Sequence, residues 1–287
     1  MEFTSNNLTF VIVTFNSRKV IYDCLNSLPS DFNKLIVENS SDEELKKELE
    51  RNYDKTEVIL SRNIGMGAAN NIGILKSNTQ YVYVLNPDVI LKKDTLFNIN
   101  KSISGLENFA ILSPISDNLN YPNYKTGSQT QTLNNNTIKK VEEIDGYSMI
   151  INKNYFSDNI YFDEKFFMYL ENVDLCLRTK NKHGKIFIIQ NSKIHHLGSQ
   201  AVDDKFSKEI ELSRNWHWMW SKHYFNKKHR GILISILSGL ISLSGNFLKY
   251  LICTITFNKK RIIYKMRLSG TINALLGKRS WYRPEIN

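Results

Sequence analysis

Five short apolar segments in the first 115 residues limit the folds that this chain can adopt. They are rich in β-branched and aromatic residues, and stretches with helix signals separate them. The segments are residues 8–15, 34–40, 56–61, 81–86 and 109–114. Strands that alternate with helices in this way form a mostly parallel sheet with helices on both faces. We therefore predict an α/β fold, in which ligands bind beyond the carboxyl ends of the strands.

The fourth apolar segment ends in an acidic turn. Residues 81–85, YVYVL, have the pattern of a strand buried on both faces, and Asn86, Pro87 and Asp88 come directly after it. A buried carboxylate without a partner is costly, so Asp88 either reaches water or holds a counter-charge. One interpretation is a divalent cation, Mg²⁺ or Mn²⁺, shared with a diphosphate. The other is a turn or a helix N-cap, and the motif alone leaves both open.

A glycine-rich segment, RNIGMGAANNIG, follows the third expected strand and contains Gly-x-Gly starting at Gly65. A dinucleotide fingerprint would need a third glycine where Asn70 stands, so this pattern does not favour NAD binding. Small residues still let the backbone approach a ligand closely, and the amides of Asn63, Asn70 and Asn71 could orient polar groups. Turn chemistry and close helix–sheet packing are the alternative explanation.

Two acids lie at the expected start of a helix within FDEKFFMYLENVDLCLR, residues 162–178. Glu171 and Asp174 are three residues apart, which places them on one face of that helix within one turn. A helix N-terminus favours the ionised carboxylate, as a general base requires. Complementation of the helix dipole is the alternative.

A pair of histidines, His195 and His196, follows the apolar run KIFIIQ. Adjacent residues of a strand face opposite ways, so only one imidazole of the pair can point toward a metal.

Basic residues are concentrated in the last quarter of the chain. Residues 1–213 contain 24 Lys and Arg against 27 Asp and Glu, whereas residues 214–287 contain 14 Lys and Arg against the single acid Glu285. We therefore divide the chain into a domain of residues 1–213 and a basic helical region of residues 214–287. Such a region favours a polyanionic partner, and Arg214 is a candidate contact for a phosphate or an acceptor.

Residues 231–248 carry no charge and are flanked by basic clusters, KKHR before and NKKR after. Eighteen such residues reach the lower bound for a bilayer span. Four serines, three glycines and Asn246 weaken that interpretation, and Lys249 interrupts the apolar run. We expect interfacial helices with a basic rim, bound to a membrane surface. A buried helical subdomain or a dimer interface is the alternative, and no signature indicates a nucleic-acid partner.

The compartment is indicated by the cysteines and by the first residues. Cys24, Cys176 and Cys253 are far apart, which argues against a disulfide scaffold and favours a reducing compartment. The N-terminus lacks the features of a signal peptide, so export is not expected.

Taken in order, these motifs resemble those of the family 2 glycosyltransferases, particularly their rhamnosyltransferase-like branch. The signatures are VIVTFNS, VENSS, NIGMGAANNIG, LNPDV, FDEKFFMYLENVDLCLR and IHHLGS, which span roughly residues 8–200. The resemblance implies a GT-A fold, a Rossmann-like architecture with a mostly parallel sheet and helices on both faces. It also implies a nucleotide-sugar donor and direct transfer with inversion at the anomeric carbon.

The resemblance implies roles for individual residues as well. It places Thr14, Asn16 and Glu38 near the nucleotide base and ribose. It gives Asp88 the metal position of a DxD-like motif and His195 the position of a metal-linked histidine. The residues expected to line the nucleotide-sugar site are Thr14, Asn16, Glu38, Asn63, Gly65, Asn70, Asn71, Asn86 and Asp88.

Two departures from the family pattern affect the chemistry. Asn86 stands in place of the first acid of the DxD-like motif, which leaves one carboxylate for a metal. Asn172 stands where the family usually has the aspartate that acts as base, and an amide cannot accept a proton as a carboxylate does. We therefore expect Glu171 or Asp174 to be the base, and favour Glu171.

The expected function is that of an inverting glycosyltransferase in the biosynthesis of a bacterial surface polysaccharide such as O-antigen or capsule. The expected donor is dTDP-L-rhamnose, and the acceptor is a glycan linked to polyprenyl diphosphate. The expected location is the cytoplasmic face of the bacterial inner membrane, with peripheral or monotopic attachment. Two alternatives remain open: a UDP-hexose donor, and a catalytically silent module that docks at the membrane.

Overall fold

The computed structural model describes residues 1–284 except 107, 119, 128–131, 134–136, 199, 200 and 203. The chain forms two compact units. The first contains Met1–Asp163 and Asn172–Asp203, and the second contains Glu164–Glu171 and Asp204–Asn287. This division differs from the expected boundary after residue 213, because the second unit begins earlier and includes a short segment from the middle of the chain.

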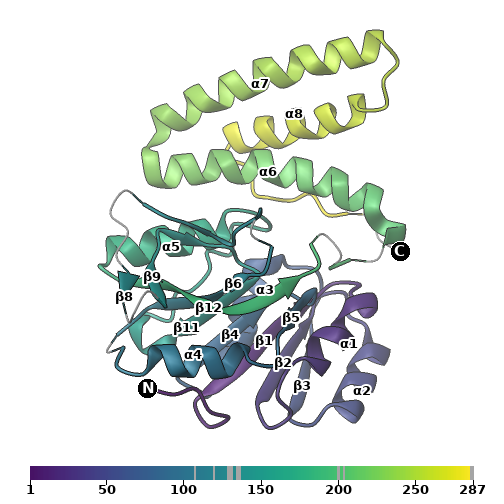
Figure 1. The fold of residues 1–287 in the computed structure, drawn as a ribbon. Coiled ribbons are helices and arrows are strands. Elements are labelled where there is room, and N and C mark those ends of the chain that lie inside the picture. The colour runs from purple at the N-terminus through teal and green to yellow at the C-terminus, as the bar shows by residue number, and fades with distance from the viewer. Residues whose placement is uncertain are drawn as a thin grey trace. The chain divides into compact units, whose positions relative to one another are not determined.

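The first unit is built on a ten-stranded sheet in the order β3-β2-β1-β4-β11-β6-β12-β9-β8, with β5 paired to β12 (Figure 1). The strands named in that order are β3 (Thr56–Leu60), β2 (Asn33–Glu38), β1 (Leu8–Thr14), β4 (Tyr81–Leu85), β11 (Ser148–Asn152), β6 (Ile111–Ser116), β12 (Ile186–His196), β9 (Ile138–Lys140), β8 (Thr132–Leu133) and β5 (Val89–Leu91). The first four are mutually parallel, and β11 joins β4 and β6 in antiparallel pairing. The predicted α/β fold with a mostly parallel sheet is confirmed.

Helices cover both faces of this sheet. Buried side chains of α1 (Arg18–Asn26), α2 (Glu43–Asn52) and α4 (Thr95–Ile103) share one core cluster. Those of α3 (Met66–Lys76) and α5 (Glu171–Asn181) share another. Alternate residues of β1 supply the two sides, since Phe10 and Ile12 belong to the first cluster and Val11 to the second. The period of two in a strand explains this arrangement.

Local sequence sets the start of two of these helices. Asp42 is the N-cap of α2, and its side chain accepts a hydrogen bond from the N–H of Leu45 at 2.9 Å. Gly65 precedes α3 with φ of 94°, a conformation that favours glycine. Gly73 lets α3 approach β1, because a Cβ there would lie 2.5 Å from Cγ1 of Val11. Part of the glycine-rich pattern is therefore structural.

The polar residues 117–140 contain three short strands, β7 (Tyr124–Lys125), β8 and β9, in the part that the structure describes. A two-stranded sheet pairs β7 with β10 (Glu143–Ile144), and β9 joins β12. Two short 3₁₀ helices, η1 (Lys153–Tyr155) and η2 (Asp204–Phe206), complete the minor elements.

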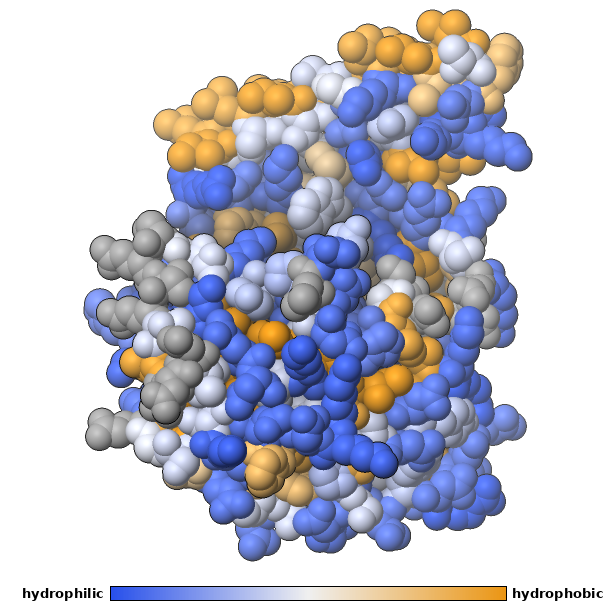
Figure 2. All heavy atoms as spheres, viewed as in Figure 1, coloured by the Kyte–Doolittle hydropathy of each residue, from blue (hydrophilic) through white to orange (hydrophobic). Residues whose placement is uncertain are grey.

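The second unit is dominated by three helices, α6 (Ser207–Arg230), α7 (Ile232–Ile255) and α8 (Arg261–Leu275). Helix α8 packs closely on α6 at Gly270, where a Cβ would lie 2.3 Å from the carbonyl oxygen of Trp216. Trp216 Nε1 also donates to Ser269 Oγ at 3.1 Å. Apolar residues gather on the exposed surface of α7 (Figure 2). This helix alone among the described residues is long and apolar enough to cross a membrane.

Candidate active site

Asp88 lies in the turn after β4, where that strand ends at the carboxyl edge of the sheet. Its side chain is 2% exposed, and Oδ1 is buried without a hydrogen-bond partner. Oδ2 lies 3.4 Å from Nε2 of His196, and the backbone carbonyl accepts a hydrogen bond from Leu197 N–H at 3.0 Å. The carboxylate therefore has neither of the roles expected of a turn or N-cap residue.

The histidine beside Asp88 is His196, not the expected His195. Strand β5 pairs with β12 so that Val89 is opposite His196 and Ile90 is opposite His195. Because adjacent strand residues point to opposite faces, His195 points away and its Nδ1 lies 3.1 Å from Oδ2 of Asp117. The prediction that placed His195 with Asp88 is corrected accordingly.

Two further side chains surround His196. The ring of Tyr147 stacks on the imidazole with ring centroids 3.9 Å apart. Asp145, which the sequence analysis did not single out, interacts electrostatically with His196, and burial raises the pKa of its carboxyl. Both come after β10 in the chain, and no sequence motif identified them.

The described residues contain no group of three or more His, Cys, Asp or Glu side chains able to hold a metal ion. The unpartnered Oδ1 of Asp88 and Nε2 of His196 nevertheless supply one oxygen and one nitrogen ligand at one point. Magnesium and manganese are commonly held by one or two protein groups, while phosphate oxygens and water complete the shell. These residues fit that kind of partial site.

Glu38 ends β2, and its carboxylate shapes the turn after that strand. The side chain is 0% exposed. Oε2 accepts hydrogen bonds from the backbone N–H groups of Ser40 at 3.0 Å and Asp42 at 2.8 Å, and Oε1 accepts one from Ser40 Oγ. Glu38 therefore orders the loop at the carboxyl edge of the sheet, and a direct contact with a base or ribose stays a prediction.

Thr14 and Asn16 lie at the end of the neighbouring β1. Thr14 Oγ1 is buried without a hydrogen-bond partner. Asn16 has φ of 51°, and its N–H donates to Ser40 Oγ at 3.3 Å. The turns after β1 and β2 are therefore joined at the edge where Asp88 also lies.

The amides of the glycine-rich segment have different roles. Asn63 Oδ1 accepts hydrogen bonds from Asn39 Nδ2 and from the N–H of Gly65, both at 3.3 Å. Asn71 exchanges two hydrogen bonds with the backbone of Phe162, at 2.9 and 3.0 Å. Its side chain therefore links α3 to a distant loop, and its contact with a ligand stays a prediction. Asn70 remains a candidate, because its Oδ1 is buried without a partner.

Asn86 contributes its backbone to the same edge. Its N–H donates to the carbonyl of Tyr147 at 3.0 Å, and its own carbonyl accepts from Cys24 Sγ at 3.8 Å. These bonds hold the turn that carries Asp88.

Asp174 forms a buried ion pair with Arg178. It is 0% exposed and accepts a hydrogen bond from Arg178 Nε at 2.8 Å. Arg178 in turn donates to the carbonyls of Ile160 and Tyr161. A buried carboxylate paired in this way is a poor base, so the pairing favours a structural role, and catalysis by Asp174 stays a prediction. Asn172 is likewise used structurally, since Nδ2 donates to the carbonyl of Ile144 at 2.9 Å.

Glu171 has the opposite environment. Its Oε2 is buried and has no hydrogen-bond partner, and burial raises the pKa of the carboxyl from 4.5 to about 7. The two residues before it, Tyr169 and Leu170, have φ of 69° and 68°. Non-glycine residues in the left-handed region store strain that is typical of functional sites.

Glu171 is the last residue of the segment that belongs to the second unit, and α6 holds that segment. Ser221 Oγ donates to the carbonyl of Met168 at 2.7 Å. The ring of Phe167 lies 4.5 Å from that of His217, and the guanidinium of Arg283 lies 3.7 Å from the Phe167 ring centroid. The position of Glu171 therefore depends on the helical unit.

The C-terminal tail packs against α6 through His217. His217 is 0% exposed, and its ring nitrogens lie 2.8 Å from the carbonyl of Tyr282 and 2.9 Å from Ser280 Oγ. Burial lowers the pKa of His217 to about 3, so the ring is neutral. Residues 280–283 thus fasten α6 and the Glu171 segment together.

Arg214 lies near this segment, where its charge interacts with Tyr169. Tyr169 packs edge-on against Trp218 with ring centroids 5.6 Å apart, and Trp218 is 44% exposed. Ser213 Oγ is buried without a partner. The sequence analysis singled out Arg214 alone of these residues, because its charge was the only signal.

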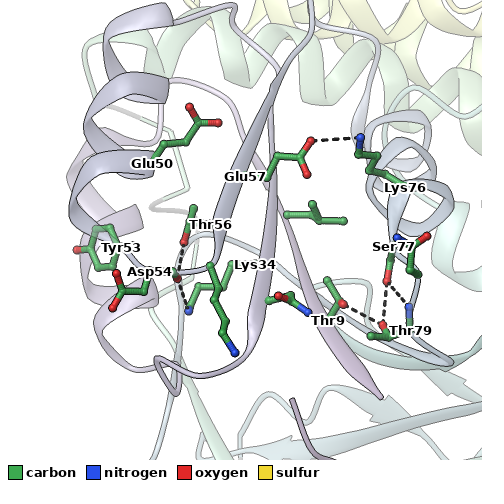
Figure 3. A pocket seen from close by; sticks show the side chains of 14 residues that line it. Thr9, Lys34, Glu50, Tyr53, Asp54, Thr56, Glu57, Lys76, Ser77 and Thr79 are labelled. Carbon is green, nitrogen blue, oxygen red and sulfur yellow. Dashed lines mark hydrogen bonds and ion pairs between the residues drawn. The ribbon is translucent and has the colours of Figure 1, made fainter. Parts of the chain in front are cut away.

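A groove of about 530 Å³ lies at the opposite edge of the sheet, where β1, β2 and β3 begin (Figure 3). Its cations already have partners. Lys34 Nζ donates to the carbonyls of Ser30, Phe32 and Asp54. Lys76 pairs with Glu57 at 3.4 Å, as Figure 3 shows. We assign no function to this groove.

The sequence of this chain matches one known protein family. The family described as "Glycosyl transferase family 2" matches residues 9–177. This range includes β1, Asp88 and Glu171, and ends before β12.

Two curated proteins are similar over most of their length. The low-salt glycan biosynthesis hexosyltransferase Agl10 of Haloferax volcanii is 28% identical over 83% of this chain and 82% of its own. The rhamnosyltransferase WbbL of Escherichia coli is 24% identical over 76% of this chain and 92% of its own.

Solved structures share the fold. Residues 1–349 of TarS from S. aureus, in complex with UDP-GlcNAc, match 96% of this chain and 93% of that chain, with a TM-score of 0.53 and 17% identity. GalNAc-T7 with UDP, GalNAc and Mn²⁺ matches 74% of this chain and 51% of that chain, with a TM-score of 0.52 and 13% identity. The first unit therefore has the GT-A architecture.

Proposed function

The chain belongs to glycosyltransferase family 2, and from this premise we propose that it transfers L-rhamnose from dTDP-L-rhamnose to a lipid-linked glycan with inversion. The chain is a glycosyltransferase, so the alternative of a catalytically silent module is not supported. The name of one relative, a rhamnosyltransferase, supports the choice of sugar. The UDP and UDP-GlcNAc bound in two similar solved structures support the rival donor, a UDP-hexose.

The observation that carries the proposal is that two buried carboxylates each keep one oxygen without a hydrogen-bond partner, Oδ1 of Asp88 in the first unit and Oε2 of Glu171 in the second. Buried charges are normally paired, and unpaired ones with shifted pKa values are typical of functional sites. Asp174, only three residues after Glu171, is paired with Arg178. The contrast favours Glu171 as the group that reacts.

We assign the role of general base to Glu171. The acceptor hydroxyl attacks the anomeric carbon on the face opposite the nucleotide and transfers its proton to the Glu171 carboxylate. The new glycosidic bond forms as the bond to the diphosphate breaks, and the nucleoside diphosphate leaves with the electron pair. A pKa of about 7 matches a base that must gain a proton near neutral pH.

In this proposal the nucleotide-sugar donor binds at the carboxyl edge of the sheet. Asp88 and His196 would hold Mg²⁺ or Mn²⁺, which neutralises charge on the leaving diphosphate when bound. Thr14 Oγ1 and Asn70 Oδ1, both buried without partners, are the polar groups available to orient the nucleotide sugar. Glu38 and Asn63 keep their loops in place around it.

The acceptor is proposed to be a glycan on polyprenyl diphosphate at the cytoplasmic face of a bacterial inner membrane. The exposed apolar surface of α7 and the cations of the last quarter support a membrane location. Arg214 is the proposed contact to a phosphate or acceptor oxygen, because it lies in the same unit as Glu171 and interacts with Tyr169.

The test is turnover of a panel of dTDP- and UDP-sugars with a polyprenyl-diphosphate-linked acceptor, with and without Mn²⁺. We expect transfer from dTDP-L-rhamnose, an inverted product, and loss of turnover in Glu171→Gln. Transfer from a UDP-hexose alone would replace the donor in this proposal. Binding of nucleotide sugars without turnover of any of them would contradict it.

A further inference from the structure

Helix α7 buries small and polar residues and exposes large apolar ones, the reverse of an amphipathic helix in a soluble protein. The four residues that it buries are small or polar: Ser235, Gly239, Asn246 and Cys253. Its twelve large apolar side chains that are exposed include Leu233, which is 74% exposed, Ile241 at 73% and Ile255 at 75%. A helix of a soluble domain buries its apolar stripe instead. An exposed apolar surface of this extent marks an interaction site.

The polar stripe of α7 is used by the neighbouring helices. Ser235 Oγ donates to the carbonyl of His223 at 2.9 Å, and Asn226 Nδ2 donates to Ser238 Oγ at 3.1 Å. Gly239 allows close contact, since a Cβ there would lie 3.0 Å from Leu275 of α8. The polar face is therefore satisfied within the unit, and only the apolar face is left for a partner.

Exposed cations lie at both ends of α7. Lys227 and Arg230 precede it, and Lys259 and Lys260 come after it. Residues 214–287 contain 14 Lys and Arg against the single acid Glu285, so this region is strongly cationic. Even Lys249, in the middle of the apolar stretch, directs its ammonium toward the ring of Tyr264 on α8, 5.9 Å from the centroid. An apolar strip between two basic ends complements an anionic lipid surface.

The packing of α8 argues against a span. Helix α7 has 24 residues and is about 36 Å long, enough to cross a bilayer. However, α8 packs along α7 and carries Arg261, Lys265 and Arg267. A crossing α7 would take these cations into the hydrocarbon or separate the helices and expose the polar stripe, and both are costly.

We propose that α7 lies flat in the headgroup region of an anionic bilayer, with its apolar face toward the acyl chains, and does not cross it. This inference deepens the membrane location in the proposed function. It concerns only the partner of the helical unit, so its test does not depend on sugar transfer.

Binding is tested by flotation of the full chain with phosphatidylcholine vesicles, with and without phosphatidylglycerol. We expect association that requires phosphatidylglycerol, and at least tenfold weaker association for the double variant Leu237→Lys, Ile241→Lys. Leu75→Lys is the matched control, because Leu75 is an exposed apolar side chain of α3 in the first unit. Thermal unfolding checks that each variant folds, and donor binding reports on the first unit separately.

Depth is tested with single cysteines at 233, 241, 248 and 255, in a background where the three native cysteines are serine. An environment-sensitive probe at each position is quenched by lipids labelled at known depths. A flat helix gives the same shallow depth at all four positions. A depth that is greatest near the middle would show a span and overturn the proposal.

A second copy of the chain is the other occupant that the test can reveal. A dimer in solution that Leu237→Lys, Ile241→Lys makes monomeric, with no vesicle association of the wild-type chain, would assign this face to self-association instead. Transfer activity in detergent would still be expected in that case, so the two failures can be told apart.

Discussion

The two units of this chain differ in where their large apolar side chains lie. The first unit buries its aliphatic strands between two layers of helices. The second unit buries a small aromatic cluster around Trp216 and Trp220 but exposes the apolar face of α7, and it leaves Oε2 of Glu171 without a hydrogen-bond partner. The first arrangement is that of a domain in water. The second indicates that a surface and a substrate complete the interactions that the unit does not satisfy itself.

The largest expected effect separates the two acids of α5. Glu171→Gln should reduce the transfer rate by about 10²–10⁴-fold, because it removes the base and keeps the shape of the side chain. Thermal stability and donor binding should be retained. Initial rates with saturating donor measure this effect, and wild-type activity in the variant would assign the base elsewhere.

Asp174→Asn should show the reverse behaviour. Removing one partner of a buried ion pair leaves Arg178 uncompensated, which destabilises by about 3–5 kcal/mol. Chemical denaturation measures this loss. The remaining folded protein should turn over with an unshifted pH profile, and a selective loss of kcat without a loss of stability would make Asp174 a catalytic candidate again.

The two histidines give a smaller and equally direct contrast. His196→Ala should weaken Mn²⁺-dependent stabilisation of the donor complex by about 10–100-fold, because its Nε2 lies beside Asp88. His195→Ala is the matched control and should leave it unchanged, since His195 pairs with Asp117 on the other face. Thermal shift with Mn²⁺ and nucleotide sugar reports both, and equal effects would remove the metal role from His196.

Ionisation of Glu171 should raise the transfer rate and lower the free energy of unfolding as the pH rises. The base must be ionised, so the rate should rise with pH through about 7. A folded pKa above the unfolded value means that the native state holds this proton more tightly between pH 4.5 and 7. The unfolding free energy from this group should therefore fall across that window as pH rises, by about 3 kcal/mol. Glu171→Gln should lose this part of the slope, and an unchanged slope would exclude the assignment.

The smallest expected effect concerns the C-terminal tail. Arg283→Ala removes a cation from the face of Phe167, a contact of about 0.5–1 kcal/mol, and should lower kcat by a few-fold without changing the KM for the donor. Arg279→Ala, which removes the same charge from an exposed position in the same tail, is the control. Arg283→Lys should restore part of the loss, and equal losses in Arg279→Ala would indicate a nonspecific effect of charge.

Sequence patterns alone predicted the architecture of the first unit. The five apolar segments correspond to β1, β2, β3, β4 and β6, with shifts of only a few residues at their ends. The turn at Asp88 was also predictable, because the residues after a strand buried on both faces must lie at the edge of the sheet. Periodicity and turn chemistry are local properties, and both are carried by the chain itself.

The partners of the polar side chains could not be predicted in this way. Asp88 meets His196 because of the register of β5 on β12, two strands that are about 100 residues apart. Asn71 hydrogen-bonds the backbone of Phe162, 91 residues further along the chain, whereas Asp174 and Arg178 are an i,i+4 pair of α5 that helix periodicity alone brings together. A residue type fixes which hydrogen bonds a side chain can donate or accept, whereas the tertiary structure decides which groups it meets.

The same division holds for the helical unit. Its composition predicted an apolar, basic region with affinity for a membrane surface, because charge and hydropathy are sums over residues. Only the packing of α6, α7 and α8 decided that Ser235 and Asn246 face inward while residues such as Leu233 and Leu237 face outward. The direction in which a helix faces depends on its neighbours, and those neighbours are brought together by folding.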